Sequence, residues 1–172
     1  AAARFTHAFV VGRSTRGASP VDYLQMMSHT CAANLAQLFE VRGMVMPTVS
    51  ACASGSHAIG AAFDAIRAGR QPLMLAGGAE ELHPIVVAVF DMLLATSCRN
   101  DAPDTAPAPF DAHRDGLVVG EGAGALLLEE LDHARERGAP ILAEVVGFGM
   151  CCDGGHLTQP DAAGMERAMT LA

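Results

Sequence analysis

Basic residues are scarce in this sequence, and lysine is absent. The 172 residues include 11 basic ones, all of them arginine, against 19 acidic ones, so the net charge is -8. A nucleic-acid surface needs clustered basic side chains to neutralise phosphates, and the sequence has no such cluster, which argues against nucleic acid as a partner. Tryptophan is absent too and tyrosine occurs once, so aliphatic and methionine side chains must fill the core.

Long apolar runs and paired cysteines are also missing. No stretch reaches the ~20 apolar residues of a membrane helix, and Arg4 and His7 interrupt the N-terminal run that a signal peptide would need. The five cysteines have no CxxC spacing, which indicates free thiols instead of disulfides or a zinc ribbon. Asp153 and His156 share one loop, but two residues are too few to predict a metal site. We expect a soluble, cytoplasmic protein that holds no metal and spans no membrane.

Short apolar runs alternate with longer amphipathic ones, which predicts an α/β layered fold. Strands are expected at residues 9–12, 44–50, 72–76, 117–119, 125–128 and 141–147. Helices are expected at residues 21–40, 54–68, 81–95 and 131–137, with a last helix that is still running at residue 172. Pro20 suits the first turn of one helix, and Gly69 suits the end of another.

Cys52 is the strongest candidate for chemistry. It lies where the expected strand 44–50 meets the expected helix 54–68, so its thiol comes just before the N-terminus of a helix. The partial positive charge and free N–H groups of a helix N-terminus stabilise a thiolate, and the same amides can bind an oxyanion. The alternative is a buried structural cysteine, which composition alone favours. Four cysteines are interpreted in that way: Cys31, Cys98, Cys151 and Cys152.

Two neighbouring features are interpreted as structural. His57 lies on the helix after Cys52, off the face from which a base could reach the sulfur. The run at residues 120–124, Gly-Glu-Gly-Ala-Gly, lacks the GxGxxG spacing of a dinucleotide site. It also joins two apolar runs instead of a strand and a helix, which argues against a nucleotide loop.

Residues 50–55, Ser-Ala-Cys-Ala-Ser-Gly, resemble the nucleophile motif of the elongating beta-ketoacyl-acyl carrier protein synthases of the thiolase superfamily. Four further blocks of that family follow in the same order and spacing, at residues 75–80, 109–124, 143–149 and 153–158. The resemblance implies a thiolase-like α/β fold, with most of the first half-domain at residues 1–139 and the start of the second at 140–172. It also implies a homodimer, or a heterodimer with a related subunit, that pairs through the strand 44–50.

By the same resemblance, the parent protein is an acyltransferase in fatty acid or type II polyketide synthesis. Cys52 attacks the thioester of acyl carrier protein and holds the acyl chain, and its backbone N–H is half of the oxyanion hole. Decarboxylation of malonyl-acyl carrier protein gives an enolate that attacks the acyl-enzyme and forms a carbon–carbon bond. No cofactor is implied, because the phosphopantetheine of the carrier protein holds the substrates.

Five other positions match positions to which the family gives a role. Val86 and Phe90 match the lining of the acyl pocket, and Thr158 lies where the phosphopantetheine tunnel opens. Arg99 matches a basic position that meets the acidic carrier protein. Asp153 matches the supporting polar network.

The sequence also departs from the family pattern. The two histidines and the lysine that serve decarboxylation lie in later family motifs, and none of the seven histidines here occupies such a motif. Losing one preorganised donor costs ~100 to 1,000-fold in rate, so we expect a piece of a condensing enzyme that does not condense by itself. Two alternatives stay open. Cys52 argues against a non-catalytic partner of the chain-length-factor type, and residues 109–124 argue against a coenzyme A-dependent thiolase.

The elements around Cys52 are apolar or small, and the layers that cover them in a complete synthase are missing from the sequence. Seven side chains are therefore expected to face solvent: Val49, Ala51, Ala53, Ile59, Ala61, Ala62 and Phe63. Exposed patches of this kind mark an interaction surface or an aggregation hazard, so the isolated polypeptide is expected to associate.

Overall fold

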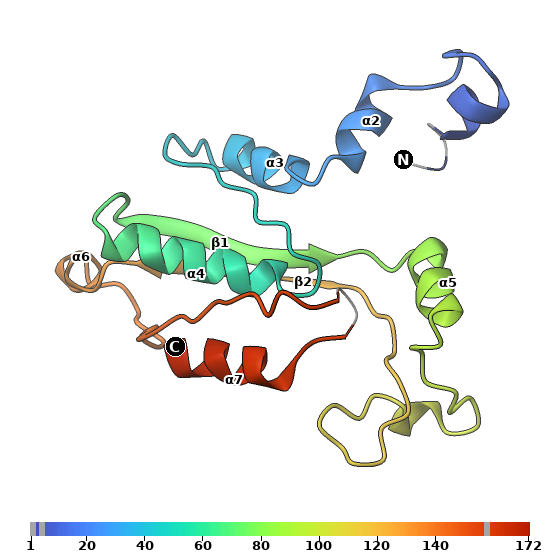
Figure 1. Cartoon of the computed structure of the whole chain (residues 1–172). Helices are drawn as coiled ribbons and strands as arrows, with labels where there is room; N and C mark the ends of the chain where they lie inside the picture. Colours follow the sequence, from blue (N-terminus) through green and yellow to red (C-terminus); the bar gives the residue numbers. More distant parts are fainter. Residues whose placement is uncertain (1–2, 4–5, 157–158) are drawn as a thin grey trace. The chain divides into compact units, whose positions relative to one another are not determined.

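The computed structural model describes residues 3, 6–156 and 159–172 (Figure 1). Its elements are, in chain order, the π-helix η1 (His7–Val11), α2 (Pro20–Met26), α3 (Thr30–Leu38), α4 (Ser54–Arg67), β1 (Leu73–Glu80), α5 (Pro84–Met92), the 3-10 helix η2 (Pro103–Thr105), β2 (Gly122–Glu129), α6 (Leu131–Glu136) and α7 (Ala162–Leu171). β1 and β2 are hydrogen-bonded into a two-stranded sheet. No helix in this described part is long and apolar enough to cross a membrane.

The chain divides into two compact units. One comprises Ala1–Ala76 and Leu126–Ala172, and the other comprises Gly77–Ala125. This division differs from the predicted boundary between half-domains at residue 140, which stays a prediction. Each unit is described by itself below.

The first unit has its core where α4 packs on the sheet (Figure 1). Ala62 of α4, Ala76 of β1 and Leu128 of β2 are buried in one cluster. Partly buried apolar residues pack against this cluster: Ala58, Ile59, Phe63, Ile66 and Met74. The small side chains of the two alanines let the helix and the strand approach closely. The prediction that Ala62 faces solvent is therefore wrong, because the strands cover this face of α4.

α4 begins at the predicted residue and ends within one residue of the prediction. It starts at Ser54 and runs to Arg67, and Gly69 follows in the left-handed region with a φ of +68°. The Gly69 N–H donates to the carbonyl of Ile66 at 2.9 Å, which satisfies one of the last carbonyls of the helix. A glycine adopts this conformation without the steric cost that a Cβ brings. α6 likewise confirms the predicted helix 131–137.

The predicted helix 21–40 is two helices in the structure, α2 and α3. The N–H of Met27 donates to the carbonyl of Leu24 at 3.1 Å, and the hydroxyl of Thr30 donates to the same carbonyl at 2.5 Å. The Leu24 carbonyl thus accepts one hydrogen bond from a tightened last helical turn and one from a side chain. Met27 then takes an extended backbone with a ψ of 127°. The single-helix prediction is wrong because these local bonds end the first helix.

The predicted helix 81–95 is confirmed over a shorter range, as α5. Its start is set by Pro84 at the first helical position and by His83, whose ring Nδ1 accepts the Ile85 N–H at 3.2 Å. Proline has no N–H to continue a helix backwards, and the residue before it avoids helical backbone. α5 therefore begins later than its apolar pattern predicts.

Three strand predictions are wrong. Residues 44–49 and 141–147 have no regular secondary structure, and residues 9–11 belong to the π-helix η1. A strand needs a neighbouring strand to pair its N–H and C=O groups, whereas a helix pairs them within itself. The sheet in the described residues contains β1 and β2 alone, so the first two segments have no partner in it.

The glycine-rich run 120–124 is not a connection between two strands, because β2 already starts at Gly122. The predicted strand 117–119 is wrong as well: Leu117 makes an isolated bridge to Thr96, and residues 118–119 have no regular secondary structure. Within the second unit, a Cβ at Gly77 of β1 would lie 2.1 Å from the carbonyl oxygen of Gly124 on β2. The missing Cβ of Gly77 therefore lets the two strands approach closely at this point.

At the end of β2, in the first unit, a nearly buried carboxylate binds one side chain of α6 and one that follows its end. The Glu129 side chain, 8% exposed, accepts two bonds from the Arg137 guanidinium at 2.6 Å each and contacts the His133 ring at 2.5 Å. The hydrogen bonds from Arg137, followed by the contact with His133, lower the pKa of Glu129 to about 2 from an ordinary value of 4.5. Charged Glu129 is thus stabilised in the folded chain.

Glu129→Gln in the parent protein is expected to lower stability at neutral pH but not near pH 2. Because folding lowers the pKa of Glu129, its stabilisation is complete above about pH 5 and is lost as the pH falls towards about 2. Urea midpoints between pH 7 and pH 2.5 should therefore converge for the wild type and the variant. Glu136→Gln, in the short helix α6 that follows Glu129, is the control. A difference for Glu129→Gln that stays constant with pH would contradict the assignment.

Candidate active site

Cys52 lies in a tight turn that leads into α4. Ala51 before it has a φ of +44°, in the left-handed region that residues with a Cβ rarely adopt. The N–H of Ala53 donates to the carbonyl of Ser50 at 3.0 Å, and the N–H of Ser54 donates to the carbonyl of Ala51 at 3.1 Å. These two bonds close the turn around Cys52 and leave its thiol exposed.

The first turn of α4 suits the chemistry predicted for Cys52. Ala53 is the residue that caps the helix, and it offers no side chain to the first-turn amides. The positive end of the helix dipole is therefore not neutralised by an acidic residue in the cap or the first turn. The backbone N–H of His57 donates to the carbonyl of Ala53 at 2.9 Å, which is a bond of this first turn.

Asp153 closes the loop before α7, also in the first unit. Its Oδ1 accepts the N–H of Gly155 at 2.8 Å, and its Oδ2 accepts the N–H of Asp161 at 2.9 Å. The bond from Asp161, and then the bond from Gly155, hold the pKa of Asp153 below its ordinary value. A supporting role in a polar network fits these contacts but stays a prediction. Thr158, predicted at the mouth of the phosphopantetheine tunnel, lies outside the described residues.

Val86 and Phe90 lie on α5 in the second unit. They are four residues apart and share one face of the helix, and both are half-buried. Ile85 and Val89 on α5 are 58% and 48% exposed. The structure thus distinguishes a more sheltered face that carries the two predicted pocket residues from an open one. Their role in binding an acyl chain stays a prediction.

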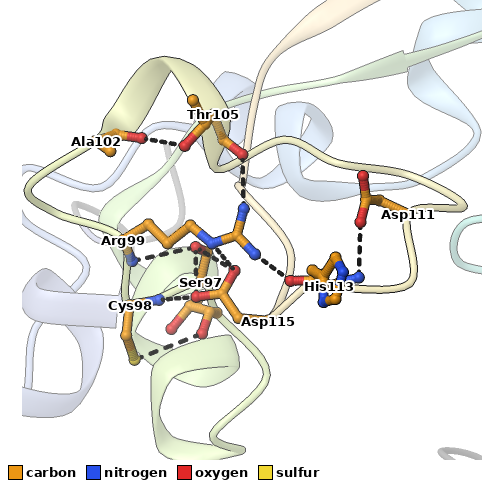
Figure 2. A network of polar contacts seen from close by, with 9 residues as sticks. Ser97, Cys98, Arg99, Ala102, Thr105, Asp111, His113 and Asp115 are labelled. Carbon is orange, nitrogen blue, oxygen red and sulfur yellow. Dashed lines mark hydrogen bonds and ion pairs between the residues drawn. The ribbon is translucent and has the colours of Figure 1, made fainter.

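Arg99 is held by acceptors within the second unit (Figure 2). Its Nη1 donates to the carbonyl of Thr105 at 3.0 Å, its Nη2 donates to the carbonyl of His113, and its Nε lies 3.4 Å from Oδ1 of Asp115. The guanidinium therefore joins three points of the loop 97–115. This internal use competes with the contact to a carrier protein, which stays a prediction.

Asp115 was not singled out by the sequence, yet it organises this loop (Figure 2). It accepts the N–H of Cys98 at 2.9 Å and the Ser97 hydroxyl at 2.8 and 3.0 Å. The bond from Cys98, and then the bond from Ser97, hold the pKa of Asp115 below its ordinary value. Its position in the block 109–124 is the feature of the sequence that could have pointed to this role.

Cys98 is exposed, so the buried structural role predicted for it is wrong, and the same holds for Cys31 and Cys152.

The prediction that the loop 153–156 holds no metal ion rests on sequence. In the part of the chain that the structure describes, no group of three histidine, cysteine or acidic side chains could hold a metal ion.

The predicted site residues are divided between the two units: Cys52 and Asp153 lie in the first, and Val86, Phe90 and Arg99 lie in the second.

Comparison with known proteins identifies the class. The family model for the beta-ketoacyl synthase N-terminal domain matches residues 6–134. The chain belongs to the beta-ketoacyl synthase family. Its predicted fold, a partial thiolase-like α/β fold, is confirmed by solved ketosynthase structures that share it.

Three relatives show how far the likeness extends. A crystal structure of a beta-ketoacyl synthase from Burkholderia phymatum is 55% identical, with a TM-score of 0.93 over 99% of this chain and 42% of that one. In a structure of a type II polyketide synthase acyl-carrier protein in complex with its ketosynthase, the matched chain is 30% identical, with a TM-score of 0.86 over 98% of this chain and 44% of that one. The 3-oxoacyl-acyl-carrier-protein synthase 1 of Escherichia coli K12 is 39% identical over 93% of this chain and 40% of its own length. The chain thus spans about two fifths of such relatives.

Proposed function

We propose that the protein containing this chain (the parent protein) is a beta-ketoacyl-acyl carrier protein synthase and that Cys52 carries its acyl group. The observation that supports this best is the exposed Cys52 thiol in a hydrogen-bonded turn before α4, in a chain of this family. Exposure allows a thioester to reach the sulfur, and the helix N-terminus favours the negative charge that the reaction creates. Three other cysteines are also exposed, so the turn and not exposure distinguishes Cys52.

The first half of the proposed reaction needs residues that this chain supplies. The Cys52 thiolate attacks the carbonyl carbon of an acyl thioester and gives a tetrahedral oxyanion, to which the Cys52 N–H donates a hydrogen bond. The oxyanion collapses and the bond to the phosphopantetheine sulfur breaks, and that sulfur leaves as a thiol after it takes up the proton that the Cys52 thiol gave up. The acyl chain is then bound to Cys52 as a new thioester, and no cofactor takes part.

The second half needs donors beyond those that we assign to this chain. Malonyl-carrier protein loses carbon dioxide, and the resulting enolate attacks the carbonyl of the Cys52 thioester. The new carbon–carbon bond forms as the Cys52 sulfur leaves, and the product stays on the carrier protein. The enolate charge needs preorganised donors, for which the family resemblance offers two histidines in later motifs.

An acyl carrier protein is the proposed partner. Support comes from the solved neighbour in which a ketosynthase is in complex with its acyl-carrier protein. Because Arg99 already binds three acceptors within its own unit, its contact with the carrier would have to use the 29% of the side chain that is exposed. We propose that the parent protein works as a dimer, of two copies or with a related subunit.

The function is tested by carbon dioxide release. The parent protein is given an acyl thioester of the carrier protein together with malonyl-carrier protein that is labelled in its free carboxyl group. It should release labelled carbon dioxide in step with the formation of the beta-ketoacyl product. A non-catalytic chain-length-factor-type subunit would release none, and it would not be labelled at Cys52 by an acyl thioester.

Val86→Trp in the parent protein is expected to shorten the range of accepted acyl chains. The larger ring would fill space on the sheltered face of α5, so long acyl thioesters should acylate Cys52 roughly 10-fold or more slowly while short ones keep their rate. The measurement is the acylation rate for a series of chain lengths. Ile85→Trp, at an exposed neighbour on the same helix, is the matched control. An unchanged chain-length profile for Val86→Trp would remove this residue from the pocket.

A further inference from the structure

The Ala51–Cys52 peptide bond is held from one side by a side chain. The hydroxyl of Ser54 donates to the carbonyl oxygen of Ala51 at 2.7 Å and accepts the N–H of Ser50 at 2.8 Å. The backbone N–H of Ser54 donates to the same Ala51 carbonyl at 3.1 Å. One side chain therefore joins Ser50 and Ala51, the two residues that come immediately before Cys52.

Ser54 is itself fixed by a second hydroxyl. The hydroxyl of Thr48 donates to the carbonyl of Ser54 at 3.0 Å, in a part-buried position. The left-handed Ala51 between them is an uncommon backbone state for a residue with a Cβ, so the turn depends on contacts that stabilise it. The bonds of the Ser54 hydroxyl to Ser50 and Ala51 are such contacts.

These contacts bear directly on the amide of Cys52. The carbonyl of Ala51 and the N–H of Cys52 belong to one planar peptide unit, in which they point in opposite directions. Two hydrogen bonds on the carbonyl therefore fix the direction of the N–H. They also polarise the peptide, which makes the N–H a stronger donor.

We propose that Ser54 is a positioning residue that aims the Cys52 N–H at the oxyanion formed during acylation. This inference rests on the proposed function, since it needs a thioester carbonyl at Cys52. The Ser54 hydroxyl bonds to the backbone of Ser50 and Ala51, so it acts through the peptide that precedes the nucleophile. Its effect should therefore fall on reactions that form an oxyanion and not on other reactions of the thiol.

The test compares two reactions of Cys52 in Ser54→Ala, made in the parent protein. Acylation by an acyl thioester passes through an oxyanion, and alkylation by iodoacetamide does not. The maximal acylation rate is expected to fall on the order of 10-fold, less than the ~100-fold or more that follows loss of an oxyanion donor itself. The thioester concentration for half-maximal rate and the alkylation rate should each change less than about 2-fold.

Two variants serve as controls. Ser54→Thr keeps the hydroxyl and should restore acylation to within about 3-fold of the wild type, whereas Ser56→Ala removes a hydroxyl from the same helical turn and should change neither reaction. If Ser54→Ala does not fold, Ser54→Cys gives the same comparison with a weaker donor of similar size.

The outcomes separate this inference from the function on which it rests. If the wild type is not acylated at Cys52, the proposed function fails, and the role of Ser54 fails with it. If the wild type is acylated and Ser54→Ala is acylated equally fast, the role of Ser54 alone is wrong. Equal losses in acylation and alkylation would also overturn it, because they would show a general effect on the thiol.

Discussion

Cys52→Ala in the parent protein is expected to lower kcat for condensation by roughly 10⁶-fold, the size of loss known for removal of a catalytic nucleophile. The reaction proposed above passes through a thioester on this sulfur, and alanine offers no atom that could replace it. The variant should still fold, since the Cys52 side chain is exposed and the bonds of its turn come from other residues. The measurement is release of labelled carbon dioxide coupled to product formation.

The other cysteines supply matched controls for this substitution. Cys31, Cys98 and Cys152 are exposed like Cys52, but they do not lie in a turn that leads into a long helix. Cys98→Ala and Cys152→Ala should therefore keep activity within about 3-fold of the wild type. Loss of activity in Cys98→Ala with retention in Cys52→Ala would show that Cys52 is not the nucleophile.

The 172-residue polypeptide alone is expected to associate or aggregate, and to release no carbon dioxide from malonyl-carrier protein. Its buried apolar residues in the described part are five alanines and Leu128. Such a core offers little to offset the conformational entropy of folding.

The exposed side chains show where covering surface is needed. Val49 before the Cys52 turn is 69% exposed, and Leu142 and Val146 are 98% and 83% exposed. α5 is apolar on nearly every face, a pattern of helices that are buried all round. Apolar area left in water costs about 25 cal/mol per Å², so these surfaces favour association with other chains.

Sedimentation of the isolated polypeptide checks this expectation. Fast-sedimenting or polydisperse species are expected, with strong binding of an apolar dye. A compact monomer that unfolds cooperatively would contradict it, as would carbon dioxide release by this polypeptide that depends on Cys52.

Elements with local causes could be predicted from the sequence. α4 was predicted because small and apolar residues recur at helical spacing from Ser54 and because Gly69 ends the pattern. The position of Cys52 before α4 followed from the same pattern. Helices satisfy their hydrogen bonds within the segment, so the segment carries the information.

The segments 44–50 and 141–147 show where such prediction ends. Both have the apolar, β-branched character of strands, but a strand forms only when a partner lies beside it. Nothing in their own residues reports whether that partner is present, and in the described part of this chain it is not.

The roles of two polar side chains, Ser54 and Asp115, could not be predicted from the sequence either. The role of Ser54 depends on the left-handed Ala51, which brings the hydroxyl to the carbonyl and the N–H of neighbouring residues. Asp115 lies far along the chain from Ser97 and Arg99, and only the folded loop brings them together. Side-chain partners of this kind depend on backbone conformations that residue types alone do not specify.

The site of acylation is the most direct test of the central claim that Cys52 is the acyl-carrying nucleophile. The parent protein is incubated with an acyl-carrier protein thioester, trapped at acidic pH, digested and mapped by mass spectrometry. The predicted result is one acyl group per chain, on the peptide that contains Cys52, and none on that peptide in Cys52→Ala. Acyl groups on Cys31, Cys98, Cys151 or Cys152 with Cys52 unmodified would contradict the claim.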